Sequence, residues 1–209
     1  MQDISAISRG PIFLVGDLRQ AGDAYATAVL NHLQRARIRN EIVFELFSMP
    51  TAEFLQQIDN AVANWSLELS PESHDEEIRR RQDSTVFFSN QEMEETIQTA
   101  LSLNCHRIDV FFMIGLPGQT QASVMESIAY CEKLFRHSDQ RLSCFISPLG
   151  PFLDPASKGF EAPEAEGYHL FARTLAAHRE LLVQPTWERI LNYETRWMSR
   201  RELVEATYD

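Results

Sequence analysis

Residues 109–120 read Asp-Val-Phe-Phe-Met-Ile-Gly-Leu-Pro-Gly-Gln-Thr, an apolar run followed by a glycine-proline turn. The segment from Val110 to Gly115 is apolar or glycine throughout, which is typical of a parallel strand covered on both faces. Gly115 and Gly118 would allow backbone to approach a ligand closely at the carboxyl end of this strand, where α/β folds keep their binding sites. The stretch therefore predicts a buried strand with a ligand site at its end.

Apolar runs alternate with helical patterns along most of the chain, which is the pattern of repeated βα units. The predicted strands are residues 12–15, 42–47, 65–70, 108–115 and 142–146. Five parallel strands with right-handed crossovers fit either an open doubly wound sheet or part of a βα barrel. Both architectures place their sites at the carboxyl ends of the strands, and periodicity alone does not choose between them.

The sequence changes character after Pro148, where proline and glycine become frequent up to residue 163. This composition predicts an extended connection with little regular structure. A helix is expected from about residue 164 to 183, because apolar residues recur there at helical spacing. Capping-box pairs at residues 89 and 92 and at residues 199 and 202 predict two further helix starts. We therefore expect one α/β domain over residues 1–149 and a separate extension over residues 150–209.

Composition and charge restrict the class of protein. A length of 209 residues with 44% hydrophobic content fits a globular α/β protein, and a formal net charge of -11 argues against nucleic-acid or anionic-membrane partners. No apolar run approaches eighteen residues, and the first residues lack the features of a signal peptide. Three widely spaced cysteines suit reduced thiols better than disulfides. These features predict a cytoplasmic protein with no membrane partner.

A basic run at residues 79–81 directly follows an acidic run at residues 75–77. Opposite charges at this spacing predict a solvated helix with i,i+4 ion pairs, rather than a nucleic-acid patch. The chain carries no zinc-ligand spacing, phosphate-binding loop or nucleophile elbow.

Acidic, hydroxyl and small residues lie at the ends of the predicted strands, at residues 16–17, 45, 68–73, 114–117 and 147–148. Carboxylates accept hydrogen bonds from an amine or a ribose diol, and glycine or proline backbone can line a flat base. Glu68 and Ser70 share one face of their strand by period-two alternation. If that face is buried, either a ligand or neighbouring strands and water must satisfy these groups, and both interpretations stay open.

Three of these segments, in this order, resemble motifs of the radical S-adenosylmethionine (SAM) superfamily. They are residues 16–17, 67–75 and 112–120, and the most similar group carries a cobalamin-binding domain ahead of the radical core. The resemblance runs from about residue 10 to 148, and residues 150–155 and 191–195 are similar in the extension. It implies a partial βα barrel, with about five parallel strands of a six-unit core, followed by a helical C-terminal extension.

The resemblance also implies which residues bind SAM, a small-molecule cofactor. Gly16 and Asp17 would contact the methionine amino group, with Asp17 in place of the more usual glutamate. Arg80, or its neighbour Arg79, would pair with the methionine carboxylate. The remaining positions would meet the ribose, the methionyl end and the adenine, and they are Glu68, Ser70, Glu72, Ile114, Gly115, Leu116, Pro117, Phe145 and Pro148.

The cysteines depart from the family pattern. Radical SAM enzymes hold a 4Fe-4S cluster with three closely spaced cysteines, usually CxxxCxxC, on the loop after the first strand. Cys105, Cys131 and Cys144 lack this spacing and suit core thiols. By the resemblance, the first strand and its loop would precede Met1.

The chain is therefore expected to be a fragment of a radical SAM enzyme, and the alternatives are a subunit completed by a partner that carries the cluster or a non-catalytic binding or assembly module. The complete enzyme would reductively cleave SAM to start radical chemistry on a substrate that the sequence does not identify. The isolated chain is expected to lack this activity. Use of cobalamin is implied only by the resemblance to the cobalamin-associated group.

Overall fold

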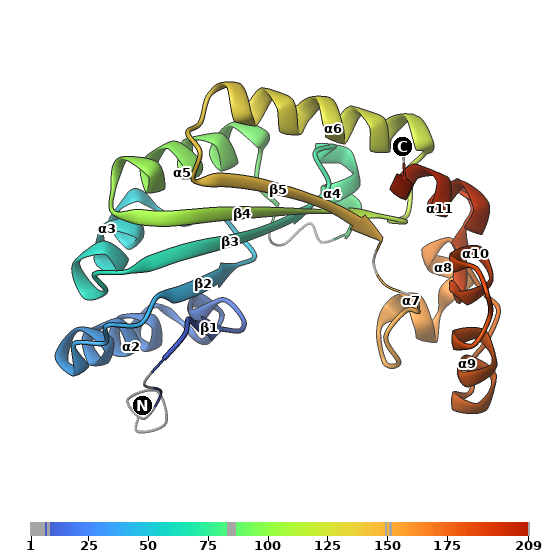
Figure 1. The fold of residues 1–209 in the computed structure, drawn as a ribbon, viewed down its shortest axis with the longest axis horizontal. Coiled ribbons are helices and arrows are strands. Elements are labelled where there is room, and N and C mark those ends of the chain that lie inside the picture. Colours follow the sequence, from blue (N-terminus) through green and yellow to red (C-terminus); the bar gives the residue numbers. More distant parts are fainter. Residues whose placement is uncertain (1–6, 8, 83–86, 149, 151, 209) are drawn as a thin grey trace. The chain divides into compact units, whose positions relative to one another are not determined.

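A computed structural model describes residues 7, 9–82, 87–148, 150 and 152–208 (Figure 1). One five-stranded sheet has the order β1-β2-β3-β4-β5, and its strands are parallel. The strands are β1 (Ile12–Leu14), β2 (Ile42–Leu46), β3 (Trp65–Glu72), β4 (Cys105–Ile114) and β5 (Leu142–Pro148). Because sequential strands are neighbours in space, the sheet has the order of consecutive βα units, as predicted.

Helices connect these strands, and local capping explains where several of them begin. They are η1 (Leu18–Ala21), α2 (Asp23–Ala36), α3 (Ala52–Ala61), α4 (Glu76–Gln82), α5 (Asn90–Ser102) and α6 (Gln121–Arg136). The Thr51 side chain caps α3, and Ser89 forms a capping box with Glu92 at the start of α5, as predicted. In the part of the chain that is described, no helix has both the length and the apolar character needed to cross a membrane.

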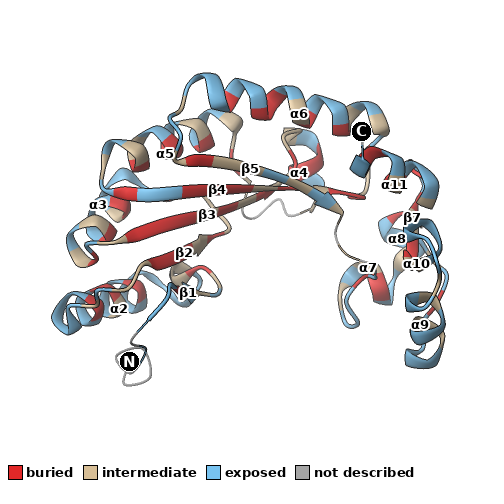
Figure 2. Cartoon of the chain, in the orientation of Figure 1, coloured by how far each residue is buried: buried red, intermediate tan, exposed pale blue. Residues whose placement is uncertain are grey.

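The two faces of the sheet differ in burial. Phe44 pairs with Leu67 on one face, and both are fully buried. On the other face Glu45 pairs with Glu68, and both are half-buried. Figure 2 shows buried residues along the length of β3 and β4. The alternation arises because successive side chains point to opposite faces of a strand, so one face carries the core and the other carries polar groups.

The prediction that residues 110–115 are covered on both faces is wrong. Val110, Phe112 and Ile114 are buried, whereas Phe111 and Met113 are half-exposed. Apolar side chains on both faces of a strand do not by themselves show that both faces are covered. Here every second one belongs to the open face.

By its internal contacts the chain divides into two compact units. Unit 1 comprises Met1–Pro71, Thr85–Phe111 and Cys131–Phe145, and unit 2 comprises Glu72–Ser84, Phe112–Tyr130 and Ile146–Asp209. Unit 2 therefore combines the C-terminal extension with the ends of three strands. The predicted division after residue 149 stays a prediction.

The extension consists of short elements. They are α7 (Lys158–Glu161), α8 (Pro163–Glu166), β6 (Tyr168–Leu170), α9 (Leu175–Leu182), α10 (Trp187–Ile190), β7 (Tyr193–Thr195) and α11 (Arg200–Tyr208). β6 and β7 pair antiparallel. The predicted capping box at the start of α11 is confirmed, because Ser199 and Glu202 exchange backbone and side-chain hydrogen bonds.

The predicted helix over residues 164–183 is wrong, because the segment contains α8, β6 and α9 in succession. Gly167 ends α8 in a left-handed conformation with φ 84°. A Cβ atom at Gly167 would lie 2.5 Å from the Trp197 ring, so a side chain is excluded there. Thr174 then caps α9 as a separate helix. Helical spacing of apolar residues did not reveal this glycine stop.

The extension packs against the turn that follows β4. Gly115 has φ 99°, and a Cβ atom there would lie 3.2 Å from the Tyr193 ring and 3.3 Å from Leu203 Cδ2. Tyr193 and Leu203 belong to the buried core of unit 2 together with Ile114. The close neighbours of the Gly115 backbone are thus side chains of the extension.

We expect Gly115→Ala to destabilise unit 2 more than Gly118→Ala. Both glycines have positive φ, which costs an alanine about 1–2 kcal/mol. Only Gly115 faces packed core atoms, whereas Gly118 faces the mobile end of Arg81, so overpacking adds about 1–3 kcal/mol at Gly115 alone. Urea denaturation of both variants measures the difference. Equal losses would contradict the proposed packing.

Candidate functional site

The carboxyl ends of β1 and β2 are joined by a buried ion pair in unit 1. The Gly16 N–H donates to Glu45 Oε2 at 2.6 Å. Asp17 Oδ1 accepts from Arg19 N and Nε at 2.9 Å each, and Asp17 Oδ2 accepts from Arg19 Nη2 at 2.5 Å. The same guanidinium donates to the backbone oxygens of Ser48 and Met49. Asp17 therefore fixes the loop geometry, and its predicted contact with a methionine amino group stays a prediction.

Carboxylates gather on the open face of the sheet in unit 1. Glu68 lies opposite Glu45 in the register of β2 and β3. Burial raises the pKa of Glu68, the charges of Asp109 and Glu45 raise it further, and Arg107 opposes them. Because these neighbours are mostly anionic, an additional cation or a hydrogen-bond donor near Glu68 would be stabilising. Ser70 is half-buried on the same face of β3.

Arg107 partly compensates this charge. Its Nε lies 3.0 Å from Asp109 Oδ2, and its Nη2 lies 3.9 Å from Glu41 Oε1. Burial raises the pKa of Asp109, while Arg107 lowers it. Ser66 Oγ donates to Glu41 Oε1 at 2.5 Å. Neighbouring strands therefore satisfy part of this polar face, although Glu68 retains carboxylate neighbours.

An aromatic pair lies beside these polar groups on the open face of unit 1. The rings of Phe111 and Phe145 stack with centroids 4.9 Å apart and planes inclined by 13°. Phe145 is 45% exposed, so it presents a flat apolar surface. Such a surface can contact a planar ligand, as predicted for Phe145, but the stacking itself requires only the two strands.

One buried amide holds the turn after β4 in unit 2. Gln119 Oε1 accepts from the N–H groups of Gly115 and Leu116 at 2.9 Å each, and its Nε2 donates to the Met113 carbonyl at 2.8 Å. Gln119 is 1% exposed. The N–H groups of Gly115 and Leu116 are therefore bound within the protein. Sequence reasoning missed this role, for which the only signal was a polar residue directly after the glycine-proline turn.

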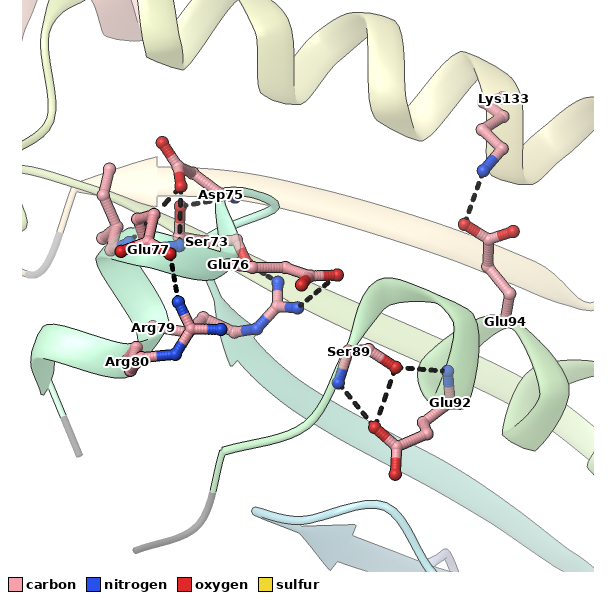
Figure 3. Close-up of polar contacts among 11 residues, drawn as sticks. Ser73, Asp75, Glu76, Glu77, Arg79, Arg80, Ser89, Glu92, Glu94 and Lys133 are labelled. Carbon is pink, nitrogen blue, oxygen red and sulfur yellow. Dashed lines mark hydrogen bonds and ion pairs between the residues drawn. The ribbon is translucent and has the colours of Figure 1, made fainter. Parts of the chain in front are cut away.

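The basic run on α4 differs from the prediction of a solvated helix. The helix is present, but its ion pairs have i,i+3 spacing, with Arg79 paired to Glu76 at 3.9 Å and Arg80 paired to Glu77 (Figure 3). Arg79 is 6% exposed, and its Nη1 donates to the Ser73 carbonyl at 2.6 Å. Burial lowers the pKa of Arg79. Arg80 and Arg81 remain at the surface, and the predicted contact of Arg80 with a carboxylate is untested.

A pocket of about 250 Å³ in unit 2 brings together three of the predicted site residues, Glu72, Leu116 and Pro117. The other lining residues are Gln82 and eight residues of the extension, among them Phe152, Asp154, Lys158, Glu166 and Tyr168. Glu72 has φ 63°, a left-handed conformation that is uncommon outside glycine. Burial raises the pKa of the Glu72 carboxyl. The extension therefore contributes most of this pocket, which sequence reasoning did not foresee residue by residue.

The remaining predicted residues have other environments. Ile114 is buried in the unit 2 core, and Gly115 contacts Tyr193. Pro148 lines a separate apolar pocket of about 170 Å³, whose wall includes Leu191, Leu203 and Tyr208. Gly16, Asp17, Glu68, Ser70 and Phe145 belong to unit 1.

The described residues do not fit the ligand set of a 4Fe-4S cluster, which needs three or four thiolates within reach of one another. Cys105 is buried at the start of β4, and burial raises its pKa to about 12. Cys131 and Cys144 form a hydrogen-bonded thiol pair between α6 and β5. In the described ranges no group of three histidine, cysteine or acidic side chains could hold a metal ion.

Solved structures share this fold. A radical SAM methyltransferase, TsrM from Kitasatospora setae with cobalamin and a 4Fe-4S cluster bound, matches 95% of this chain with 39% of its own length, at 12% identity and a TM-score of 0.62. The same enzyme with tryptophan and a SAM analogue bound matches 63% of this chain and 25% of its own, at 13% identity and a TM-score of 0.52. Coproporphyrinogen III oxidase (HemN) from Escherichia coli, a radical SAM enzyme, matches 88% of this chain and 48% of its own, at 15% identity and a TM-score of 0.51.

This chain thus spans less than half the length of each of these proteins. No protein-family model matches the sequence, and no curated protein matches it significantly. At these identities the similarity establishes the fold.

We expect Arg19→Met to cost about 3 kcal/mol of stability, because it leaves the buried Asp17 carboxylate without its cation. The double variant Asp17→Asn with Arg19→Met should recover much of that loss, since asparagine also caps helices and carries no charge. Urea denaturation measures both variants. Arg136→Met is the control, because Arg136 is an exposed arginine of unit 1 in an i,i+4 pair and should contribute little. An Arg19 variant no weaker than this control would show that the pair is dispensable.

We expect Glu72→Gln to stabilise the protein at neutral pH. The folded-state pKa of Glu72 is raised above its ordinary value of 4.5, so the charged carboxylate lowers stability as the pH rises from 4.5 through the folded pKa. The gain of the variant should therefore be greatest at neutral pH and vanish below about pH 4.5. Denaturation at a series of pH values tests this, with Glu180→Gln on the exposed face of α9 as the control. A gain that persists below pH 4 would exclude this cause.

Proposed function

Because the described chain has the fold of radical SAM enzymes, we propose that it is the C-terminal part of such an enzyme. The complete form would reductively cleave SAM at a 4Fe-4S cluster and start radical chemistry on a substrate that is not yet known. The similarity to TsrM supports this proposal because it extends over 95% of the chain. We further propose a cytoplasmic location, in agreement with three free cysteines and a net charge of -11.

The observation that carries the proposal is the set of polar and small residues at the carboxyl ends of the strands. In unit 2, Glu72 and the turn residues Leu116 and Pro117 line one pocket. We propose that the Glu72 carboxylate accepts hydrogen bonds from ribose hydroxyls and that the turn residues contact the adenine. Arg80 would pair with the methionine carboxylate.

The remaining residues of the proposed SAM-binding set belong to unit 1. Gly16 and Asp17 would lie near the methionine amino group, which an anionic surface favours. Glu68 and Ser70 offer acceptors on the open face of β3, and Phe145 offers a flat ring for the adenine. Pro148 completes the proposed set.

The cluster would be supplied from outside this chain, because Cys105, Cys131 and Cys144 do not fit its ligand pattern. A preceding segment of a longer protein or a partner subunit would carry the cluster cysteines. Cobalamin remains a proposal that depends on the similarity to TsrM, and no residue of this chain is assigned to it.

A second candidate function is a non-catalytic binding or assembly module. It is favoured by the internal bonding of the groups that most resemble family motifs. Asp17 is bonded to Arg19, and Gln119 binds the N–H groups of the turn. In such a module these residues would maintain the barrel without contacting a cofactor.

We expect this chain alone to bind SAM weakly, because the cluster iron that would chelate the methionine is held elsewhere. Anaerobic expression of the full gene, or coexpression with a partner that carries CxxxCxxC, should give an iron-loaded protein that releases 5'-deoxyadenosine from SAM under reducing conditions. Iron analysis, product chromatography and calorimetry of the separate chain measure the three quantities. Tight SAM binding by the separate iron-free chain would contradict the proposal that tight binding needs cluster iron held outside this chain. An iron-loaded complete protein that forms no 5'-deoxyadenosine would support the non-catalytic module.

A further inference from the structure

The unit 2 pocket carries an excess of acidic groups. Three carboxylates line it, from Glu72, Asp154 and Glu166, and Lys158 is its one lining cation among the described residues. The lining thus carries a formal charge of -2 when all four groups are ionised. None of the three carboxylates takes part in an ion pair within the described ranges. A phosphate or carboxylate ligand would be repelled by this lining, whereas a cation would be attracted.

The carboxylates occupy two levels of the pocket. Glu72 is half-buried at the end of β3, whereas Asp154 and Glu166 are exposed. Burial alone accounts for the raised pKa of Glu72, so no described cation relieves its desolvation. A ligand cation in contact with Glu72 would provide that relief, and charge-assisted hydrogen bonds are the strongest available to a carboxylate.

The spacing of the acidic groups favours an organic cation over a metal ion. In the described part of the chain no three acidic, histidine or cysteine side chains converge closely enough to hold a metal. Apolar and aromatic residues line the same pocket, including Leu116, Leu153, Phe152 and Tyr168. Charges spread over an apolar lining suit an ammonium group carried on a hydrocarbon body.

Two further features limit the ligand. The volume of about 250 Å³ lies below the range of roughly 300–1,000 Å³ that is usual for drug-sized ligands. Gln82 Nε2 is buried and has no hydrogen-bond partner among the described residues, so the wall can donate to an acceptor near the ammonium group.

From these features we infer that the pocket binds the ammonium end of a small primary amine, with Glu72 as the inner anchor and Asp154 and Glu166 at the rim. The inference rests on the proposed function, because Glu72, Leu116 and Pro117 line the pocket in both. One oxygen of the Glu72 carboxylate would accept from the ribose and the other from the ammonium group, so the inference deepens the proposed function by naming a chemical class of substrate. The amine is the substrate or the part of it that enters between the turn after β4 and residues 152–168.

The test is a titration of this chain with n-butylamine, followed by nitrogen-proton NMR at pH 7. Butyrate and n-butanol are the matched anionic and neutral probes. Butylammonium should shift the backbone resonances of Glu72, Leu116 and Tyr168 in a saturable manner, whereas butyrate should not. Glu72→Gln should weaken the apparent affinity about tenfold, the loss of one charge-assisted hydrogen bond.

Two rim variants and a surface variant refine the test. Asp154→Asn and Glu166→Gln should each weaken binding about twofold to fivefold, because exposed charge pairs contribute less. Glu180→Gln removes an exposed charge of unit 2 outside the pocket and should leave binding unchanged. Glu72→Gln is expected to raise stability, so weakened binding in that variant would not reflect unfolding.

The inference is overturned if butyrate or butanol binds as well as butylamine, or if Glu72→Gln and Glu180→Gln behave alike. The titration requires neither SAM nor a cluster. A failed titration therefore leaves the result of the 5'-deoxyadenosine assay standing, and failure of that assay leaves a positive titration standing.

Discussion

The Gln119 side chain holds the turn on which the rest of unit 2 depends. Its amide oxygen accepts from the N–H groups of Gly115 and Leu116, and its amide nitrogen donates to the Met113 carbonyl. A buried backbone group without a partner costs about 1–3 kcal/mol, so three such groups would make an open turn unfavourable. The amide replaces the hydrogen bonds that a regular element would have supplied.

The shape of this turn determines how the extension packs. With the backbone held at positive φ, Gly115 presents a surface without a side chain, and Tyr193 and Leu203 lie against it. These two residues belong to the same core as Ile114, so the end of β4 and the extension share one set of buried contacts. The adjacent residues Leu116 and Pro117 then line the pocket together with residues 152–168. The packing contact and the candidate ligand site are thus consecutive parts of one turn.

The sheet could be predicted from the sequence because each strand is marked by residues that are close together along the chain. Apolar runs and their spacing identify β1 to β5, and capping boxes identify the starts of α5 and α11. The predicted helix over residues 164–183 is interrupted because Gly167 adopts a left-handed conformation that ends α8. The Trp197 ring, thirty residues away in the sequence, leaves no room for a side chain at Gly167, and helical spacing of apolar residues does not show this. The burial of Arg79 could not be predicted either, because a run of charged residues indicates a helix but does not show which other parts of the chain cover it.

The candidate site was only partly predictable. The resemblance pointed to Glu72 and to the turn at residues 114–117. Glu72, Leu116 and Pro117 line one pocket, and Ile114 lies in the buried core of unit 2. The wall formed by Asp154, Lys158 and Glu166 comes from short irregular elements, whose positions depend on tertiary contacts and leave no periodic pattern.

Asp17 shows that a residue at a motif position can have a different role from the one that the motif suggests. By its sequence resemblance alone, Asp17 stands at a position where radical SAM enzymes more usually have glutamate, whose side chain is one methylene longer. A short carboxylate after a strand can accept from the backbone N–H two residues later, and Asp17 does so with Arg19. The Arg19 guanidinium then binds both oxygens of the same carboxylate and ties it to Ser48 and Met49. In this protein the shorter residue therefore joins the β1 and β2 loops, and an amine that binds there would have to share a carboxylate that already has a cation.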